Sequence, residues 1–429
     1  MVMFLAQCAS AVGFSLVFPF LPFYVGQLGS TTGLSVEFWV GMVVSSQAFT
    51  MAVTAPIWGA LADRYGRKLM VQRAMFGGTV ILALMAFVTS AEQLTVLRAI
   101  QGLVTGTVPA ANALVAAITP RRHIGFAMGT IQMALWSGIA VGPLIGGFLS
   151  DLFGYEITFL ITGGLLFLGG VLVTFGVHED FAPETAKVPR RGGMVGEWRH
   201  VVASPSVGAT FFARFFASLS RSMLSPFTPL LVALLLPQAA MVNTVTGLVV
   251  GVASGAATFS AVYLGRMGDR IGYRKVFLVC ALVEASALLP QSLVTDAWQL
   301  LILQVLAGAA SGGVIAALSA LLARYTMPGE EGAVYGLDNA IVAGARATAP
   351  LVGSAMVAWA GLRSVFAVAG LIEYATVMFA SRWLPRPAQR LSDEFMPERA
   401  AGSLETASLR LNEAPNPGRG APETERRAG

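Results

Sequence analysis

Long apolar runs separated by short polar segments dominate the chain. Each run holds roughly 20 residues, the length that a helix needs to cross a hydrocarbon core about 30 Å thick. Lipid offers backbone amides no partners, so helices, which pair them internally, are the expected structure. The runs end at charged residues, Gly or Pro, and predict twelve helices at 2–26, 37–62, 69–89, 93–118, 124–149, 155–177, 207–236, 242–264, 275–294, 298–323, 332–359 and 363–384. We therefore predict an all-α membrane protein.

Composition supports this prediction. Hydrophobic residues make up 55% of the 429 positions and charged residues 12%, whereas soluble domains carry about 25% charged residues. The net charge of +5 would suit a nucleic-acid binder, but the basic residues lie in short loops, so we expect no nucleic-acid partner. Both cysteines, Cys8 and Cys280, lie inside apolar runs and are expected to be core residues.

The polar residues show no pattern typical of an enzyme. The three histidines lie in loops without metal-ligand spacing, and no phosphate-binding G-x-x-x-x-G-K loop is present. We expect no metal, no cofactor and no ATP-driven pump.

Basic residues gather in alternate loops. They follow the second, fourth, sixth, eighth and tenth predicted helices: Arg64, Arg67, Lys68, Arg121, Arg122, Lys187, Arg190, Arg191, Arg199, Arg266, Arg270, Arg274, Lys275 and Arg324. The other loops carry mainly acids. By the positive-inside rule, both termini are predicted to be cytoplasmic, in a multi-pass protein of the inner (plasma) membrane.

The two halves of the chain repeat at an offset of about 206 residues. The residues Gly59, Asp63, Arg64 and Gly66 match Gly265, Asp269, Arg270 and Gly272, and Pro19 and Pro22 match Pro226 and Pro229 with one residue of slippage. We divide the chain into an N-terminal six-helix bundle (1–177), a cytoplasmic linker (178–206), a C-terminal six-helix bundle (207–384) and a disordered cytoplasmic tail (385–429). Such symmetry suits a carrier with its site between two bundles that rock.

The loop from Gly59 to Lys68, which includes Arg67, closely resembles the signature loop of the major facilitator superfamily. That resemblance implies a fold of two pseudo-symmetric six-helix bundles. It also implies that Asp63 latches against the start of the eleventh helix near Gly332 when the carrier faces outward, and that Asp269 does likewise near Gly125. The alternative is that these charges only fix the topology.

A second segment, Leu94 to Gly102, resembles the superfamily motif whose arginine is associated with proton coupling. Here that arginine is Arg98, and Gln304 replaces it in the second half. A buried arginine in a span is a functional candidate by default. The alternative is that Arg98 snorkels to the surface.

A third segment has the glycine spacing of the antiporter motif of drug efflux carriers: Gly129, Gly138, Gly142, Pro143, Gly146 and Gly147. Together with the loop motif, the segments Phe18–Tyr24 and Val108–Leu114 make the chain similar to the tetracycline-efflux and MdtG-type branch of drug:proton antiporters. This resemblance covers residues 5–384. One difference is that residues 6–25 contain no acid, unlike the first helix of many antiporters. The alternative reading of the glycines is close helix packing alone.

Ionisable residues inside predicted spans are candidates for proton coupling. We rank Asp338 first, then Glu284 and Glu373, because an apolar site disfavours the ionised carboxyl; each is alternatively a static partner of an arginine. Arg214 and Arg221 share a helical face and would attract an anionic group. Candidates for a substrate cavity are Phe14, Phe18, Gln47, Met51, Asn112, Gln132, Trp136, Arg221, Phe227 and Arg346, together with Asp338.

The sequence thus predicts a monomeric, proton-driven antiporter that exports small amphiphilic or drug-like compounds, with antibiotic resistance as the expected phenotype. One alternative is an uptake carrier of the same fold for an anionic metabolite attracted to Arg221 and Arg346. The other is a membrane receptor or assembly protein that transports nothing.

Overall fold

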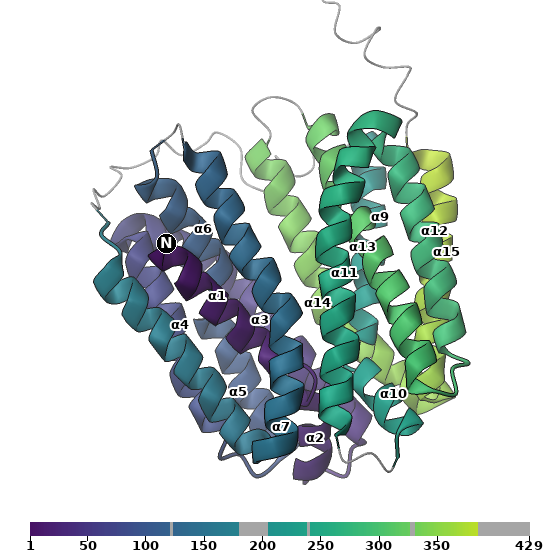
Figure 1. Ribbon diagram of the computed structural model, residues 1–429, viewed down its shortest axis with the longest axis horizontal. Coiled ribbons are helices and arrows are strands. Elements are labelled where there is room, and N and C mark those ends of the chain that lie inside the picture. The colour runs from purple at the N-terminus through teal and green to yellow at the C-terminus, as the bar shows by residue number, and fades with distance from the viewer. Residues whose placement is uncertain (121–122, 180–204, 238–240, 327–330, 385–429) are drawn as a thin grey trace, which may run out of the picture. The chain divides into compact units, whose positions relative to one another are not determined.

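A computed structural model describes residues 1–120, 123–179, 205–237, 241–326 and 331–384. The predicted linker and tail therefore lie almost entirely outside the described residues. Within them, the region Met1–Leu384 forms one compact helical unit (Figure 1). The predicted all-helical fold is confirmed, and each predicted apolar range coincides with an observed helix or helix pair.

The first half consists of α1 (Val2–Leu16), α2 (Leu21–Leu28), α3 (Val36–Tyr65), α4 (Arg67–Met85), α5 (Ala91–Val104), α6 (Thr107–Ile118) and α7 (Ile124–Gly176). The second half consists of α9 (Pro205–Leu224), α10 (Thr228–Leu235), α11 (Val242–Ile271), α12 (Tyr273–Gln291), α13 (Ala297–Tyr325), α14 (Glu331–Ala360) and α15 (Leu362–Trp383).

By length and hydropathy, nine stretches of the described chain can cross a membrane, and the bent pair α1–α2 makes ten. The 53-residue α7 holds two crossings, because its backbone breaks at Gly154. The 19-residue α12 is also long enough to cross a membrane, although it is not among these ten stretches. It carries three charged residues, Arg274, Lys275 and Glu284, whereas each of the ten stretches includes 18 successive residues with at most two. Counting both parts of α7 and adding α12, the described residues are consistent with the twelve predicted crossings.

The internal repeat extends to backbone conformation. Gly66 and Gly272 end α3 and α11 with φ of 99° and 92°, and Gly154 and Gly361 take φ of 80° and 81° at two other matching turns. Positive φ is cheap only for glycine. The repeated prolines likewise begin α2 and α10 after a break in each half. The breaks in these two crossings are features that the sequence analysis did not predict.

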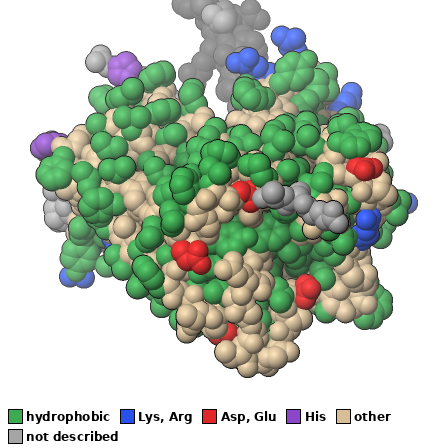
Figure 2. Space-filling model, turned by 60° about the horizontal axis from the view of Figure 1, so that its bottom comes forward, with side chains coloured by type: hydrophobic (Ala, Val, Ile, Leu, Met, Phe, Trp, Pro, Cys, Tyr) green, Lys and Arg blue, Asp and Glu red, His purple; other side chains and the backbone are tan. Residues whose placement is uncertain are grey.

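The two ends of the bundle differ in charge. We call the end with the α3–α4 and α11–α12 connections the basic end, and the end that carries Glu92, Asp151 and Asp296 the acidic end. Apolar side chains are spread over much of the face that Figure 2 shows. Large hydrophobic side chains exposed on the protein include Phe126, Phe175, Phe259 and Trp359. A contiguous exposed apolar surface of this kind indicates contact with lipid.

The two halves touch near the acidic end. Gly147 of α7 packs against the Asn243 carbonyl of α11, and Gly41 of α3 packs against Ser354 of α14. The ribbons of the two halves diverge toward the basic end (Figure 1). The structure is therefore closed at the acidic end.

Candidate functional site

A cavity of about 320 Å³ lies between the two halves. Its lining comes from α1, α7 and the break after α1 in the first half, and from α9 to α13 in the second. The lining residues are Ser15, Phe18, Ile139, Pro143, Arg221, Leu224, Ser225, Thr228, Pro229, Val250, Ala253, Ser254, Ala257, Glu284, Leu288, Gln304, Ala307, Gly308 and Ser311. The cavity is therefore mostly apolar, with several hydroxyls and one pair of opposite charges.

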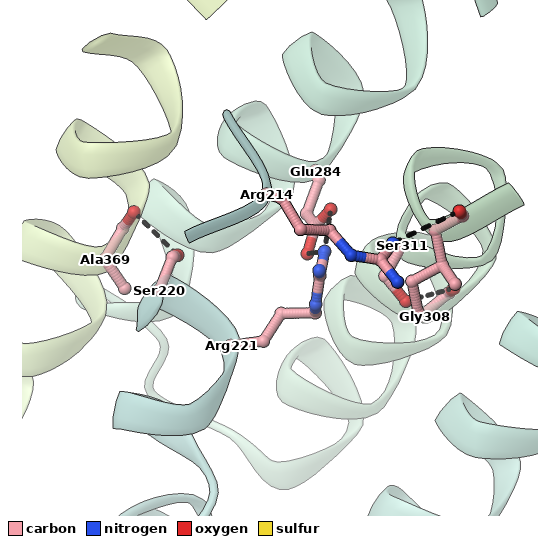
Figure 3. A network of polar contacts seen from close by, with 8 residues as sticks. Arg214, Ser220, Arg221, Glu284, Gly308, Ser311 and Ala369 are labelled. Carbon is pink, nitrogen blue, oxygen red and sulfur yellow. Dashed lines mark hydrogen bonds and ion pairs between the residues drawn. The ribbon is translucent and has the colours of Figure 1, made fainter. Parts of the chain in front are cut away.

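That pair joins Arg221 of α9 to Glu284 of α12. Arg221 Nη1 lies 3.3 Å from both carboxylate oxygens, and Figure 3 shows the two side chains pointing at each other. The side chain of Glu284 is 2% exposed and that of Arg221 24%. A charge so deeply buried is tolerated only with a partner. The pair therefore places a compensated carboxylate and a partly accessible guanidinium on one cavity wall.

A second ion pair lies two turns earlier on α9. Arg214 Nε is 3.2 Å from the Asp338 carboxylate of α14, and its Nη1 donates to the Ile315 carbonyl of α13. Residues seven apart share a helical face, so α9 presents two arginines to acids on two different helices. Asp338 is buried but is not among the cavity-lining residues.

Glu373 of α15 is fully buried, and neither of its carboxylate oxygens has a hydrogen-bond partner among the described residues. Near it, the Ser220 hydroxyl of α9 donates to the Ala369 carbonyl at 2.9 Å and joins α9 to α15 (Figure 3). An isolated carboxylate is very costly in such a place, so a carboxyl is inexpensive there only as the neutral acid.

Arg98 lies in the first half, away from the cavity lining. It is 5% exposed and so does not snorkel to the surface. Its Nη1 donates to Gln47 at 2.9 Å and to Gln101 at 3.1 Å. At the matching place in the second half, Gln304 donates to Gln291. Among the described contacts, the Arg98 guanidinium is held by neutral amides and has no acid beside it.

The other cavity candidates have different surroundings. Among them only Phe18 and Arg221 line the cavity. Phe227 is fully buried against Gly353, and Phe14 packs on the hydrophobic core. Met51 contacts Gly102, and Asn112 keeps its carbonyl oxygen buried without a partner. Gln132, Trp136 and Arg346 are exposed.

The signature loop is fixed from within the first half. The Glu179 carboxylate accepts from the backbone N–H groups of Arg67 and Lys68 at 3.0 and 2.7 Å, and so caps α4. A carboxylate at a helix start is stabilised by the exposed N–H groups. Glu179 was not a sequence candidate, because nothing in its spacing shows that it lies beside α4.

The predicted latches of this loop lie partly outside the described residues. The side chain of Asp63 and the surroundings of Gly125 and Gly332 are not described. In the second half, Asp269 accepts a hydrogen bond from the Tyr273 hydroxyl at the turn after α11, and Arg324 lies 5.0 Å from the same ring. Arg64 lies over Tyr65 at 5.3 Å. Gly59 has open space where a side chain would lie, and Gly265 only a loose contact, while Arg270 is exposed.

The glycines of the third motif lie at helix contacts. A methyl group added at Gly138, Gly142 or Gly146 would collide with α1, and one at Gly147 would collide with α11. The Ser15 hydroxyl of α1 donates to the Gly138 carbonyl at 2.9 Å. Gly129, by contrast, has nothing within 4 Å of its missing side chain. The motif thus brings α7 against both α1 and α11 beside the cavity.

Sequence reasoning missed the hydroxyls of the cavity. Ser15, Ser225, Thr228, Ser254 and Ser311 all line it. A signal did exist for Ser225 and Thr228, because they flank the repeated proline Pro226 at the break between α9 and α10. The others lie within regular helices, where only packing decides which face meets the cavity.

Comparisons with known proteins agree on one family. The model described as Major Facilitator Superfamily matches residues 3–233 and 210–410. "Multidrug resistance protein MdtG" of Salmonella dublin is 35% identical over 373 residues, covering 86% of this chain and 91% of the relative. The protein of the same name in Salmonella arizonae is 34% identical over 390 residues, covering 90% and 94%.

Solved structures show the same fold at low identity. The nucleoside transporter NupG (D323A mutant) matches with a TM-score of 0.74 and 13% identity over 90% of this chain and all of that chain. A bacterial homologue of the human lysosomal transporter Spinster, inward-facing and occupied, matches with a TM-score of 0.70 and 14% identity over 97% and 98% of the two chains.

Proposed function

Because this chain belongs to the Major Facilitator Superfamily, we propose that it exports small amphiphilic or drug-like compounds in exchange for protons. Membership of this family makes the chain a multi-pass membrane transporter of small molecules rather than an enzyme. The finer proposal covers direction, proton coupling and substrate class. It also places both termini and the basic end in the cytoplasm, and the working unit as a monomer.

The observation that carries the proposal is the cavity between the halves. Its volume of about 320 Å³ is in the range of small-molecule sites, and its lining is mainly apolar with scattered hydroxyls. A site of this kind suits varied amphiphilic compounds. The relatives named as multidrug resistance proteins support the same substrate class.

We place the coupling proton on Glu284 rather than on Asp338, because Glu284 lines the cavity and Asp338 does not. While Glu284 is ionised, its charge cancels that of Arg221. Protonation leaves the Arg221 guanidinium uncompensated on a wall of low dielectric, where it disfavours a cationic or apolar substrate. Proton and substrate would then exclude each other, as an antiporter requires. Glu373, buried nearby on α15, is a second candidate for the proton.

The arrangement of Arg221 also bears on the uptake alternative. An anionic metabolite would need a free cation, and Arg221 is paired with Glu284 only while that carboxyl is ionised. Arg346, the other arginine of the uptake alternative, is exposed, so the direction of transport has to separate the two alternatives. The electrical part of the proton motive force contributes about 2.3 kcal/mol per charge for each 100 mV. For a neutral substrate at 100 mV, inward movement of one proton therefore suffices for export against a gradient of up to about 40-fold. One-for-one exchange with a singly charged cation moves no net charge, so the pH gradient drives that exchange.

The test is transport in everted membrane vesicles with an imposed pH gradient, acid inside, with ethidium as the probe. The wild-type protein should accumulate ethidium. Glu284→Gln should lose accumulation and bind ethidium more weakly, because glutamine resembles the protonated acid and leaves Arg221 uncompensated. Glu156→Gln, an exposed acid at the acidic end, is the control and should behave as wild type.

Three results would argue against this proposal. Loss of accumulation in Asp338→Asn but not in Glu284→Gln would move the proton site to α14. Accumulation only with the gradient reversed would indicate uptake. A protein that moves no proton with any compound of a drug panel would support the receptor alternative.

A further inference from the structure

Asp151 of the first half caps a helix of the second half. It lies in α7, three residues before the break at Gly154. One carboxylate oxygen accepts from the Asn243 side-chain amide at 2.7 Å and more weakly from its backbone N–H at 3.4 Å. The other accepts from the Thr244 backbone N–H at 2.7 Å and from the Thr244 hydroxyl at 2.6 Å. Four donors at the start of α11 therefore converge on one acid from the other half.

The start of α11 depends on this foreign cap. Its own N-cap residue, Met241, provides no side-chain hydrogen bond. The first N–H groups of a helix have no partner within the helix and carry a partial positive charge. A carboxylate that accepts from such groups makes charge-assisted hydrogen bonds, about twice as strong as neutral ones.

Close backbone contacts around Asp151 mean that its four hydrogen bonds to the start of α11 form or break together. Gly147, one turn before Asp151, packs against the Asn243 carbonyl, and Gly247 packs against the Pro143 carbonyl. Asn243 is only 8% exposed. Because α7 and α11 touch through backbone here, separation of the halves at the acidic end breaks all four hydrogen bonds together.

We propose that Asp151 is a gating residue that holds the carrier closed at the acidic end and must release α11 before that end opens. The proposal rests on alternating access in the proposed function. It also gives the signature loop a counterpart: the resemblance predicts that Asp63 caps the start of α14 at the basic end in the opposite state. One acid at each end of the bundle would then cap a helix of the other half. Asp151 would do so while the acidic end is closed, and Asp63 while the basic end is closed.

The test measures the conformational equilibrium of the full chain in nanodiscs without substrate. Spin labels at Leu34 and Leu293 report the separation of the halves at the acidic end, and labels at His123 and Ile271 report the basic end. All four positions are exposed. Distances between the labels are measured by double electron–electron resonance, in a protein in which Cys8 and Cys280 are replaced by serine.

The variant is Asp151→Asn, which removes the charge and turns an amide donor toward the donors of Asn243 or Thr244. We expect the population open at the acidic end to rise roughly ten-fold. The 34–293 distance should lengthen as the 123–271 distance shortens. The matched control is Asp296→Asn, because the Asp296 carboxylate bonds Thr295 and Gln299 of its own half and no other side chain of the described residues. This control should leave both distances unchanged.

A second variant approaches the contact from the other half. Thr244→Val removes only the hydroxyl donor and should shift both distances in the same direction by a smaller amount, which keeps the proposal testable if Asp151→Asn fails to fold. Distances equal to wild type in every folded variant would overturn it. That result would leave the export proposal standing, because these distances require neither proton nor substrate. If the wild-type protein accumulated no ethidium in vesicles, that result would instead contradict the export proposal.

Discussion

At the residue scale, the strongest consequence of the cavity concerns the ion pair of Arg221 and Glu284. Removing one partner of a buried pair leaves an isolated charge and usually costs about 3–5 kcal/mol. Arg221→Ala should therefore lower the unfolding temperature of the detergent-purified protein by several degrees. The measurement is thermal unfolding followed by tryptophan fluorescence.

The double variant Arg221→Ala/Glu284→Gln provides the control. It removes both charges, so it should recover most of the stability lost in Arg221→Ala. If the double variant loses as much stability as the two single variants combined, the interaction between Arg221 and Glu284 does not stabilise the fold.

The sequence identified these charged residues but not their pairing. Arg221, Glu284, Asp338 and Glu373 were all candidates because ionisable groups in an apolar span need a reason to be there. Pairing depends on how far each helix is rotated about its axis, and a repeat of 3.6 residues per turn leaves that rotation free until neighbours pack. Glu284 was accordingly ranked below Asp338, although it is Glu284 that lines the cavity.

At the scale of helices, the glycines of α7 make a prediction with an internal control. A methyl group at Gly146 would collide with the Leu16 backbone carbonyl, whereas one at Gly129 meets nothing within 4 Å. Gly146→Ala should therefore push α7 away from α1 and destabilise the protein by about 1–3 kcal/mol, the usual cost of overpacking. Gly129→Ala should be neutral or slightly stabilising, because alanine favours helix.

Thermal unfolding and size-exclusion profiles of the two variants provide the comparison. Equal stability of Gly146→Ala and wild type would mean that α1 can move aside at little cost, contrary to the close backbone contact. The distinction matters because both glycines occupy positions of one motif, so the motif alone does not separate them.

The number and length of the helices could be predicted because lipid sets both. A crossing needs about 20 apolar residues whatever its neighbours are, and the charged loops mark its ends. The breaks before α2 and α10 were not predicted, although Pro22 and Pro229 are repeated in the halves. A proline in a membrane helix can be tolerated without a break, as Pro143 is inside α7, so the residue alone does not decide.

At the scale of the whole molecule, the structure matches one of the two states that the proposed alternating access requires. Among the described residues, close contacts between the halves lie at the acidic end, between α7 and α11 and between α3 and α14. Two bundles that touch at one end and diverge at the other form the geometry expected of a rocking transporter. The sequence repeat indicates the two bundles, but it is symmetric and so cannot indicate which end is closed.

This asymmetry leads to a prediction about locking. The Ser354 hydroxyl of α14 donates to the Glu37 carbonyl of α3 at 2.7 Å, so these positions are close across the two halves. Cysteines at 37 and 354, in a chain lacking Cys8 and Cys280 and joined by a short bis-maleimide, should hold the acidic end shut. Uphill transport in vesicles should fall to background, because the bound compound cannot be released at that end, while ethidium binding from the basic end should persist.

A protein with a single cysteine at either position, treated with the same reagent, should transport normally. Full transport in the cross-linked protein would mean that the halves need not separate at the acidic end, and rocking about the shared cavity would then no longer explain how this chain moves its substrate.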